Sequence, residues 1–284
     1  MVTLIRTTVE LVNRRNLEKK NVGFVPTMGS LHQGHISLLE KALSEFEIVY
    51  FSIFVNPLQF APHEDFNQYP RTLENDLNLI AASLKKFPGS EVVVFAPKDS
   101  AEVFPPQNDQ VISVEGLNNI LEGAVRPGHF DGVATVVHRL FQLMRPNRAY
   151  FGLKDYQQYL VIKKMVKDLV LPVEVIGMPT IRENSGLALS SRNQYLTPEE
   201  KNEALTLSKS MNELASVINH KHENIKIAQS KLKRIKEDKR WNYLEIRDAF
   251  TLSEDISHSK KIAILGVFQL RETRLLDNLQ VELQ

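Results

Sequence analysis

Short runs of β-branched and aromatic residues alternate with longer amphipathic stretches over the first 180 or so residues, and this alternation constrains the fold most. The short runs predict strands at Val22–Pro26, Ile48–Asn56, Glu91–Ala96, Val111–Val114, Arg148–Phe151 and Val173–Met178. The longer stretches predict helices around His35–Ser44, Thr72–Phe87, Phe130–Met144 and Asp155–Leu169. Because such alternation is typical of parallel βαβ units, we expect an α/β fold with a doubly wound parallel sheet.

The last third of the chain has a different pattern and predicts a second, smaller domain. Eleven of the 12 glycines lie within residues 1–186 and only Gly266 follows, so the special backbone conformations that glycine permits are concentrated in the first two-thirds of the chain. We expect an α+β domain over residues 181–284, following a first domain over 1–180. Its expected elements are a helix from Thr197 to about Val217, a helix from about Glu223 to Lys236, strands Tyr243–Arg247 and Ile262–Val267, and the segment Leu270–Leu276.

Composition excludes several classes of protein. The net charge of +1, with 43% hydrophobic and 24% charged residues, is that of an ordinary globular chain rather than a disordered one. The absence of cysteine excludes a disulfide scaffold, a thiolate zinc site and a cysteine nucleophile. No apolar run reaches the ~18 residues of a membrane span, and the start of the chain lacks the features of a signal peptide. We therefore expect a cytoplasmic protein with no membrane partner.

A basic segment between Lys226 and Arg240 raises the question of nucleic-acid binding. It carries seven basic residues against Glu237 and Asp238. A solvated helix face accounts for such a pattern more often than a nucleic-acid site does. We therefore expect no nucleic-acid partner.

The segment from Pro26 to His35 is the strongest candidate for chemistry. It places His32 and His35 three residues apart where a predicted strand passes into a helix, with Gly34 between them. A helix N-terminus offers unpaired N–H groups and a positive dipole end, both suited to phosphate. Two ordinary surface histidines or a metal pair are the alternatives, although the spacing is not the i, i+4 spacing of a zinc-protease helix.

The His-x-Gly-His string resembles the signature of the HxGH nucleotidyltransferases, and the longer string Pro-Thr-Met-Gly-x-Leu-His-x-Gly-His resembles the pantothenate synthetase family. Further blocks of the chain resemble that family in the same order. They are Phe54–Phe60, Glu64-Asp65, Tyr69–Thr72, Leu121–Gly123, Arg126–Phe130, Phe151–Gln158 and Gly186–Asn193.

The resemblance implies a Rossmann-like sheet and an AMP-forming ligase that joins pantoate to β-alanine through pantoyl adenylate. It assigns catalysis to His32, His35, Lys154 and Arg192, with His35 as the proton donor. The ATP-binding residues that it implies are Met28, Gly29, Ser30, Leu31, His32, Gln33, Gly34, His35, Gly152, Leu153, Lys154, Asp155, Ile181, Leu189, Ser190, Ser191 and Arg192. Another HxGH-type adenylyl- or cytidylyltransferase is the alternative, although such an enzyme would lack the glutamine-containing blocks.

The resemblance also implies that Gln59 and Gln158 bind pantoate and that Gln59 later binds β-alanine. A neutral amide can donate to a carboxylate or hydroxyl without the cost of desolvating a charge. Leu153 departs from the family pattern, which usually has glutamate there. We interpret this position as a backbone contact, so nucleotide binding should be kept.

Three further expectations concern a loop, the metal and the assembly. Phe60 to Arg71 lacks periodicity, and we expect a lid over the intermediate with Tyr69 at its closing edge. ATP as substrate implies Mg²⁺, for which Asp76 is a candidate ligand. Family members are typically dimers, so the resemblance implies a homodimer.

Overall fold

The computed structural model describes residues 1–62, 64, 66–106 and 110–284. Asp65 of the Glu64-Asp65 block lies outside the described residues. The chain folds into two compact units. The first comprises Met1–Leu153 and Gln158–Pro179, and the second comprises Lys154–Gln157 and Thr180–Gln284.

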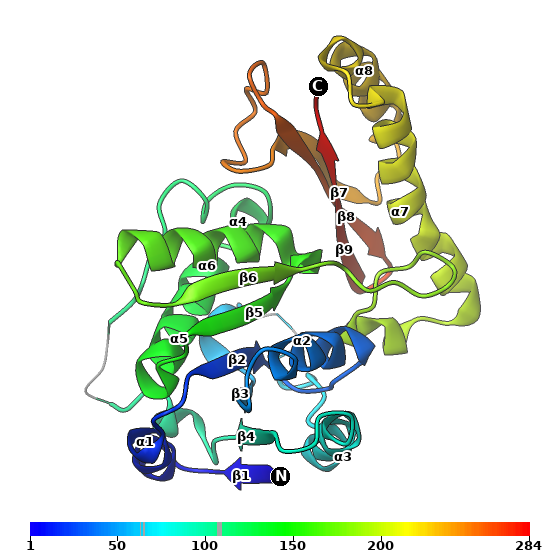
Figure 1. Ribbon diagram of the computed structural model, residues 1–284. Coiled ribbons are helices and arrows are strands. Elements are labelled where there is room, and N and C mark those ends of the chain that lie inside the picture. The colour runs from blue at the N-terminus through cyan, green and yellow to red at the C-terminus, as the bar shows by residue number, and fades with distance from the viewer. Residues whose placement is uncertain (63, 65, 107–109) are drawn as a thin grey trace. The chain divides into compact units, whose positions relative to one another are not determined.

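A sheet of six parallel strands forms the centre of the first unit (Figure 1), in the order β1-β4-β3-β2-β5-β6. The strands are β1 (Val2–Ile5), β2 (Val22–Thr27), β3 (Ile48–Ile53), β4 (Glu91–Phe95), β5 (Arg148–Gly152) and β6 (Glu174–Met178). The predicted fold class, a Rossmann-like doubly wound parallel sheet, is confirmed.

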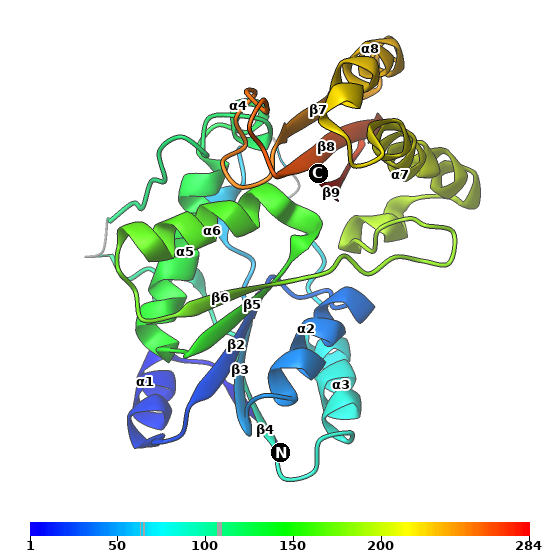
Figure 2. The same ribbon diagram turned by 45° about the horizontal axis from the view of Figure 1, so that its top comes forward.

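Helices cover both faces of this sheet (Figures 1 and 2), with α2 and α3 on one face and α1, α5 and α6 on the other. The helices are α1 (Thr8–Leu17), α2 (Gln33–Leu43), α3 (Leu73–Leu84), the short α4 (Glu122–Val125), α5 (His129–Met144) and α6 (Tyr156–Asp168). The connection after β2 leads to β3, whereas the connection after β5 leads to β6 in the opposite direction. Ligands of open α/β sheets bind where neighbouring connections diverge in this way, so the ends of β2 and β5 are the expected site.

The central strands are apolar on both faces because helices cover both sides. Val49 and Phe51 of β3 pack with Leu39 of α2 and Ile80 of α3, and all four are fully buried. Phe24 of β2 points to the other face and packs edge-on against Phe141 of α5, with ring centroids 6.1 Å apart. Burying each such side chain contributes about 1.5–3 kcal/mol, and this packing fixes the strand ends that carry the site.

Local patterns mispredicted two parts of the first unit. Residues 111–114 form no strand, because the N–H of Ile112 donates to Oγ1 of Thr135 on α5, at 2.9 Å, rather than to a neighbouring strand. Their apolar character instead reflects burial of Ile112 and Val114. The edge strand β1 and helix α1 were not predicted; within α1 only Leu11 is buried, which leaves a weak amphipathic pattern.

The second unit packs two helices on a three-stranded antiparallel sheet, in the order β7-β8-β9. The helix α7 begins where it was predicted: Thr197 caps it through a reciprocal pair of bonds with Glu200, and Pro198 occupies the first turn. The segment Leu270–Leu276 contains the turn of the β8–β9 hairpin, since Leu270 pairs with Thr273. The elements are α7 (Pro198–Ile218), α8 (Ile225–Ile235), β7 (Trp241–Asp248), β8 (Lys261–Leu270) and β9 (Thr273–Glu282).

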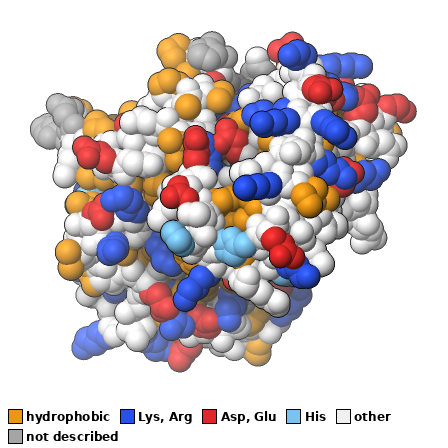
Figure 3. All heavy atoms as spheres, turned by 90° about the horizontal axis from the view of Figure 1, so that it is seen from above, with side chains coloured by type: hydrophobic (Ala, Val, Ile, Leu, Met, Phe, Trp, Pro, Cys, Tyr) orange, Lys and Arg blue, Asp and Glu red, His pale blue; other side chains and the backbone are white. Residues whose placement is uncertain are grey.

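Charged side chains of both signs lie along the basic segment of the second unit. Lys231 of α8 pairs with Glu213 of α7, and Arg240 pairs with Glu203, at 3.0 Å, and with Asp238, at 2.8 Å. Figure 3 likewise shows lysine and arginine side chains with aspartate and glutamate among them on one face of the molecule. These pairs partly neutralise the basic segment. Among the described residues, no helix is long and apolar enough to cross a membrane.

Candidate active site

The two histidines of the candidate site lie at the start of α2, directly after the central strand β2. His32 is the N-cap, and its Nδ1 accepts the N–H of Gly34 at 3.1 Å, while Nδ1 of His35 accepts the N–H of His32 at 3.3 Å. Their ring centroids are 4.1 Å apart. A neutral imidazole that accepts at Nδ1 carries its proton on Nε2. Each ring therefore carries its proton on Nε2, at a helix N-terminus whose polarity suits phosphate oxygens.

A buried carboxylate fixes the backbone that leads into these histidines. Gly29 and Ser30 both adopt positive φ angles, +82° and +51°. Asp76 of α3, which is fully buried, accepts the N–H groups of Ser30, at 3.0 Å, and Leu31, at 2.9 Å. Oγ1 of Thr72 donates to the same carboxylate at 3.1 Å. Because both carboxylate oxygens bind this loop, the geometry favours a structural role for Asp76 over its candidate role as a magnesium ligand.

The site's glutamine, Gln59, follows β3 in a short 3₁₀ turn. Its Nε2 lies 3.0 Å from Sδ of Met28, and its Oε1 accepts from Nδ2 of the buried Asn56 at 3.2 Å. The turn packs so closely on α5 that a Cβ at Gly132 would lie 2.2 Å from the carbonyl oxygen of Leu58. Only glycine fits there. These contacts hold the amide of Gln59 beside the loop that carries the histidines.

Two residues without a predicted role hold the main chain of Gln59. Its carbonyl oxygen accepts from Nδ1 of His129, at 2.8 Å, and from Nη2 of Arg126, at 3.2 Å. Nε2 of His129 accepts from Arg126 at 3.0 Å, which requires the neutral tautomer with its proton on Nδ1. The resemblance pointed to the block that contains Arg126 and His129, but nothing local indicated their partner 67 or 70 residues away.

Arg126 also binds the loop between residues 60 and 71. Its Nε and Nη2 donate to the two oxygens of Glu64, each at 2.7 Å. Burial raises the pKa of Glu64, but the hydrogen bond and charge of Arg126 outweigh burial and leave the pKa below its ordinary value. Tyr69 is buried against Phe60, with ring centroids 6.0 Å apart. The described part of this loop contains no helix or strand, and its role as a lid stays a prediction.

The other predicted site residues of the first unit are Gly152, which ends β5, Leu153, which follows it, and Gln158 of α6. Leu153 lies over Gly177 of β6, where a Cβ would be 2.6 Å from Cδ2 of Leu153. The leucine that departs from the family pattern is therefore packed against the neighbouring strand. Gln158 lies in the first turn of α6 and is partly buried.

The remaining predicted ATP-binding residues lie in the second unit. Nζ of Lys154 is 3.6 Å from Oδ1 of Asp155. Leu189 donates its N–H to the carbonyl of Ile181 at 2.9 Å, which closes the base of a hairpin-like loop. Beyond it, Oγ of Ser190 accepts the N–H of Arg192 at 3.3 Å. Ser191 and Arg192 begin a 3₁₀ turn that ends at Tyr195.

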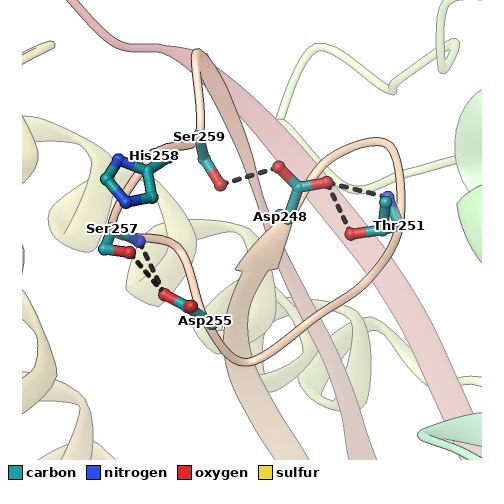
Figure 4. Close-up of a pocket in the computed structure, with 6 residues that line it drawn as sticks. All are labelled: Asp248, Thr251, Asp255, Ser257, His258 and Ser259. Atoms are coloured by element: carbon teal, nitrogen blue, oxygen red, sulfur yellow. Dashed lines mark hydrogen bonds between the residues drawn. The ribbon is translucent and has the colours of Figure 1, made fainter.

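A pocket elsewhere in the second unit is lined by the loop after β7 (Figure 4). Both oxygens of Asp248 bind within this loop, one to Thr251 and one to Oγ of Ser259, while Asp255 accepts from Ser257. These bonds account for the fold of the loop. Across the part of the chain that the structure describes, no three His, Cys, Asp or Glu side chains form a group able to hold a metal ion.

The paired histidines at the helix that follows a central strand, in a doubly wound parallel sheet, define a nucleotide-binding protein of the HxGH nucleotidyltransferase class. Residues 1–280 match the model of the pantoate-beta-alanine ligase family, and the chain belongs to that family. It is accordingly an AMP-forming ligase.

Individual relatives agree with this assignment over nearly the whole chain. Pantothenate synthetase of Thermus thermophilus is 46% identical over 284 residues, covering 98% of this chain and 98% of that protein. A crystal structure from the same organism is 44% identical with a TM-score of 0.87, covering 98% and 99%. A Francisella tularensis pantoate-beta-alanine ligase, solved with beta-gamma ATP and beta-alanine, is 34% identical with a TM-score of 0.73, covering 98% and 97%.

Proposed function

We propose that this enzyme condenses pantoate with β-alanine at the expense of ATP, through an enzyme-bound pantoyl adenylate. The observation that carries the proposal is the pair of histidines whose Nδ1 atoms are used by the helix cap. Both Nε2 positions are thereby donors, beside the anchored amide of Gln59. This combination suits an anionic phosphate chain and a hydroxy acid at adjacent places.

In the first step a carboxylate oxygen of pantoate attacks the α-phosphorus of ATP, and the bond to pyrophosphate breaks. The enzyme contributes position and stabilisation of charge rather than a covalent bond to the protein. His32 and His35 donate to the phosphate oxygens as charge develops, aided by the N-terminus of α2. His35 is the proposed proton donor to the leaving group. The loop from Met28 to Gly34, including Gln33, supplies backbone to ATP.

The other ATP contacts are assigned by family resemblance. Lys154 and the loop Ser190, Ser191 and Arg192 hold the phosphates, since an ammonium, two hydroxyls and a guanidinium suit a phosphate chain. Asp155 accepts from the ribose hydroxyls. The remaining proposed contacts to ATP come from Gly152, Leu153, Ile181 and Leu189.

In the second step the amine of β-alanine attacks the carbonyl carbon of the adenylate. The C–N bond forms, the C–O bond to AMP breaks, and the amine proton passes to solvent. Gln59 and Gln158 hold the pantoyl group, and Gln59 also binds the incoming β-alanine. No residue is assigned as a base for this amine, because β-alanine binds with its amine in the free, unprotonated form.

We further propose that ATP is used as its Mg²⁺ complex, that the enzyme acts in the cytoplasm, and that it forms a homodimer. Both oxygens of Asp76 are engaged by backbone and hydroxyl donors. We therefore assign the Mg²⁺ no ligand from Asp76, and we propose that phosphate oxygens and water hold most of its coordination sites.

Pyrophosphate release tests the proposal directly. The purified enzyme should release pyrophosphate from ATP when pantoate is present and β-alanine is absent, up to about one equivalent per active site. The methyl ester of pantoate, which lacks the attacking carboxylate, should give none. Release that requires β-alanine, or that occurs equally with unrelated hydroxy acids, would contradict the two-step route.

A further inference from the structure

We propose that Asp277 and Asn278, two successive residues of β9, are positioning residues that hold Lys154 and the Ser190–Arg192 loop in a fixed relation. The inference rests on the proposed function, because it concerns residues assigned there to ATP. All of these residues belong to the second unit.

The first half of this arrangement is an ion pair between the buried Asp277 and the partly exposed Arg182. Asp277 is 2% exposed, and its two carboxylate oxygens accept from Nη1 and Nη2 of Arg182 at 2.6 and 2.8 Å. The N–H of Asn278 adds a third bond at 2.8 Å. A planar guanidinium held at two points has a defined orientation, which a lysine ammonium cannot reproduce.

The same guanidinium fixes the loop that precedes Ser190. Its Nη1 also donates to the carbonyl of Gly186 at 3.1 Å, and the backbones of Arg182 and Ala188 form a β-bridge. The side chain of Arg182 therefore reaches across the turn that Arg182 itself begins, as far as Gly186. Leu189 donates its N–H to Ile181 directly beyond this bridge, and the Ser190–Arg192 loop begins at the next residue. The ion pair therefore fixes the position at which this loop begins.

The second half of this arrangement acts on Lys154. Nδ2 of Asn278 donates to the carbonyl oxygen of Lys154 at 2.7 Å, and Oδ1 of Asn278 accepts from Gln280 at 2.8 Å. Tyr156, two residues on, donates to the carbonyl of Ala249 at 2.7 Å. These bonds tie the short Lys154–Gln157 segment to the second unit. Successive side chains of a strand point to opposite faces. Asp277 and Asn278 of β9 can therefore contact Arg182 and Lys154 separately.

The proposal predicts a selective loss of ATP use. Asp277→Asn and Arg182→Lys keep size or charge but remove the two-point contact, and Asn278→Ala removes the bond to Lys154. Small misplacements of positioned groups can reduce rates about 10²-fold. We expect the kcat/KM for ATP in the first step to fall about 10- to 100-fold, while the KM for pantoate, assigned to first-unit glutamines, changes less than about twofold.

The matched controls are Asp238→Asn and Arg240→Lys, which alter an exposed two-point pair in the same unit. Both should leave the kinetic constants unchanged. The kcat/KM for ATP of the Asp277→Asn/Arg182→Lys double variant should be no lower than that of the worse single variant, because the two substitutions remove the same contact. Unchanged constants for ATP in Arg182→Lys and Asn278→Ala, whether or not their Tm falls, would overturn the proposal and leave a purely structural role.

Direct ATP binding by calorimetry separates this inference from the proposed function. Asn278→Ala should bind ATP about tenfold more weakly than the native chain even if neither releases pyrophosphate with pantoate. In that case the proposed reaction fails and the positioning inference stands. Equal ATP affinity in Asn278→Ala, Arg182→Lys and the native chain defeats the inference alone. Should Asp277→Asn not fold, these two variants still decide the question.

Discussion

The imidazoles of His32 and His35 both accept backbone N–H groups at the start of α2 through their Nδ1 atoms. Their spacing and their place after a predicted strand indicated phosphate binding, and the structure adds the tautomer. Since the cap uses both Nδ1 atoms, a substitution can remove the Nε2 donor without removing the cap. This separation makes the proposed role testable at a single residue.

His35→Asn is the substitution that separates the two roles. The amide oxygen of asparagine can still accept the N–H of His32, but no Nε2–H donor remains. We expect pantoate-dependent pyrophosphate release to slow about 10²- to 10³-fold, the usual cost of removing a donor to a developing oxyanion. Circular dichroism should show unchanged helix content. Full first-step activity in this variant would remove His35 from the mechanism.

Asp76 gives the second prediction at the scale of the residue. Asp76→Asn points an NH₂ group at backbone donors in a fully buried place, so we expect unfolding in urea to become easier by about 1–3 kcal/mol. First-step activity should fall because the Gly29–Leu31 backbone loses its anchor. Glu74→Gln, an exposed change in the same helix, is the control. Recovery of activity at high Mg²⁺ without loss of stability would instead indicate a metal ligand.

Site residues could be predicted where they lie in a local string, and not where their partners are distant. The string from Pro26 to His35 contains its own strand, turn and helix start. By contrast, Asp76 acts on Ser30 and Leu31 from 46 and 45 residues away. Such a contact depends on helix α3 packing beside α2, and no sequence periodicity encodes which backbone N–H a buried carboxylate will meet.

At the scale of the element, the start of a helix could be predicted from its capping residues. A strand was predicted wrongly where a hydrogen bond to a distant side chain replaces strand pairing. The start of α7 could be predicted at Thr197 because the capping chemistry of Thr197, Pro198 and Glu200 is local. Residues 111–114 have strand-like composition, yet a single side-chain acceptor on α5 takes the N–H that a strand would need. The conformation of residues 111–114 therefore depends on this tertiary contact and not on local composition.

The junction between α2 and β5 should make stability depend on pH. Hydrogen bonds from Lys41, Tyr150 and Arg148, with the charge of Lys41, outweigh burial and lower the pKa of Glu45 from 4.5 to about 2. A depressed carboxyl pKa stabilises the fold above the unfolded value, and this stability is lost as pH falls from about 4.5 to about 2.

Glu45→Gln tests this junction. The free energy of unfolding should drop by about 1 kcal/mol at pH 6, since the partly exposed carboxylate is screened by solvent. The difference from the native chain should shrink by pH 3. Urea titrations at both pH values measure it, and Glu47→Gln, at an exposed side chain nearby, is the control. A difference that stays constant between pH 6 and pH 3 would show that Glu45 contributes through packing alone.

For the whole molecule, the alternation of strands and helices was enough to predict the doubly wound sheet. It did not show that Lys154–Gln157 pack with the second unit although they lie between β5 and most of α6. The bonds responsible join Lys154 to Asn278 and Tyr156 to Ala249, separated by 124 and 93 residues. Local patterns predict the secondary structure of a segment, whereas long-range polar contacts determine the unit with which it packs.

The last prediction concerns the stability of the whole molecule with its substrates. A ligand that binds only the folded state raises the Tm, and an adenylate combines the contacts of pantoate and of the nucleotide in one molecule. ATP and pantoate together should therefore raise the Tm by more than the sum of their separate effects, and added β-alanine should abolish the excess by consuming the intermediate. His35→Asn, which forms the adenylate slowly, should show only the separate effects. An equal excess with the methyl ester of pantoate would mean that the two ligands cooperate in binding without forming the adenylate.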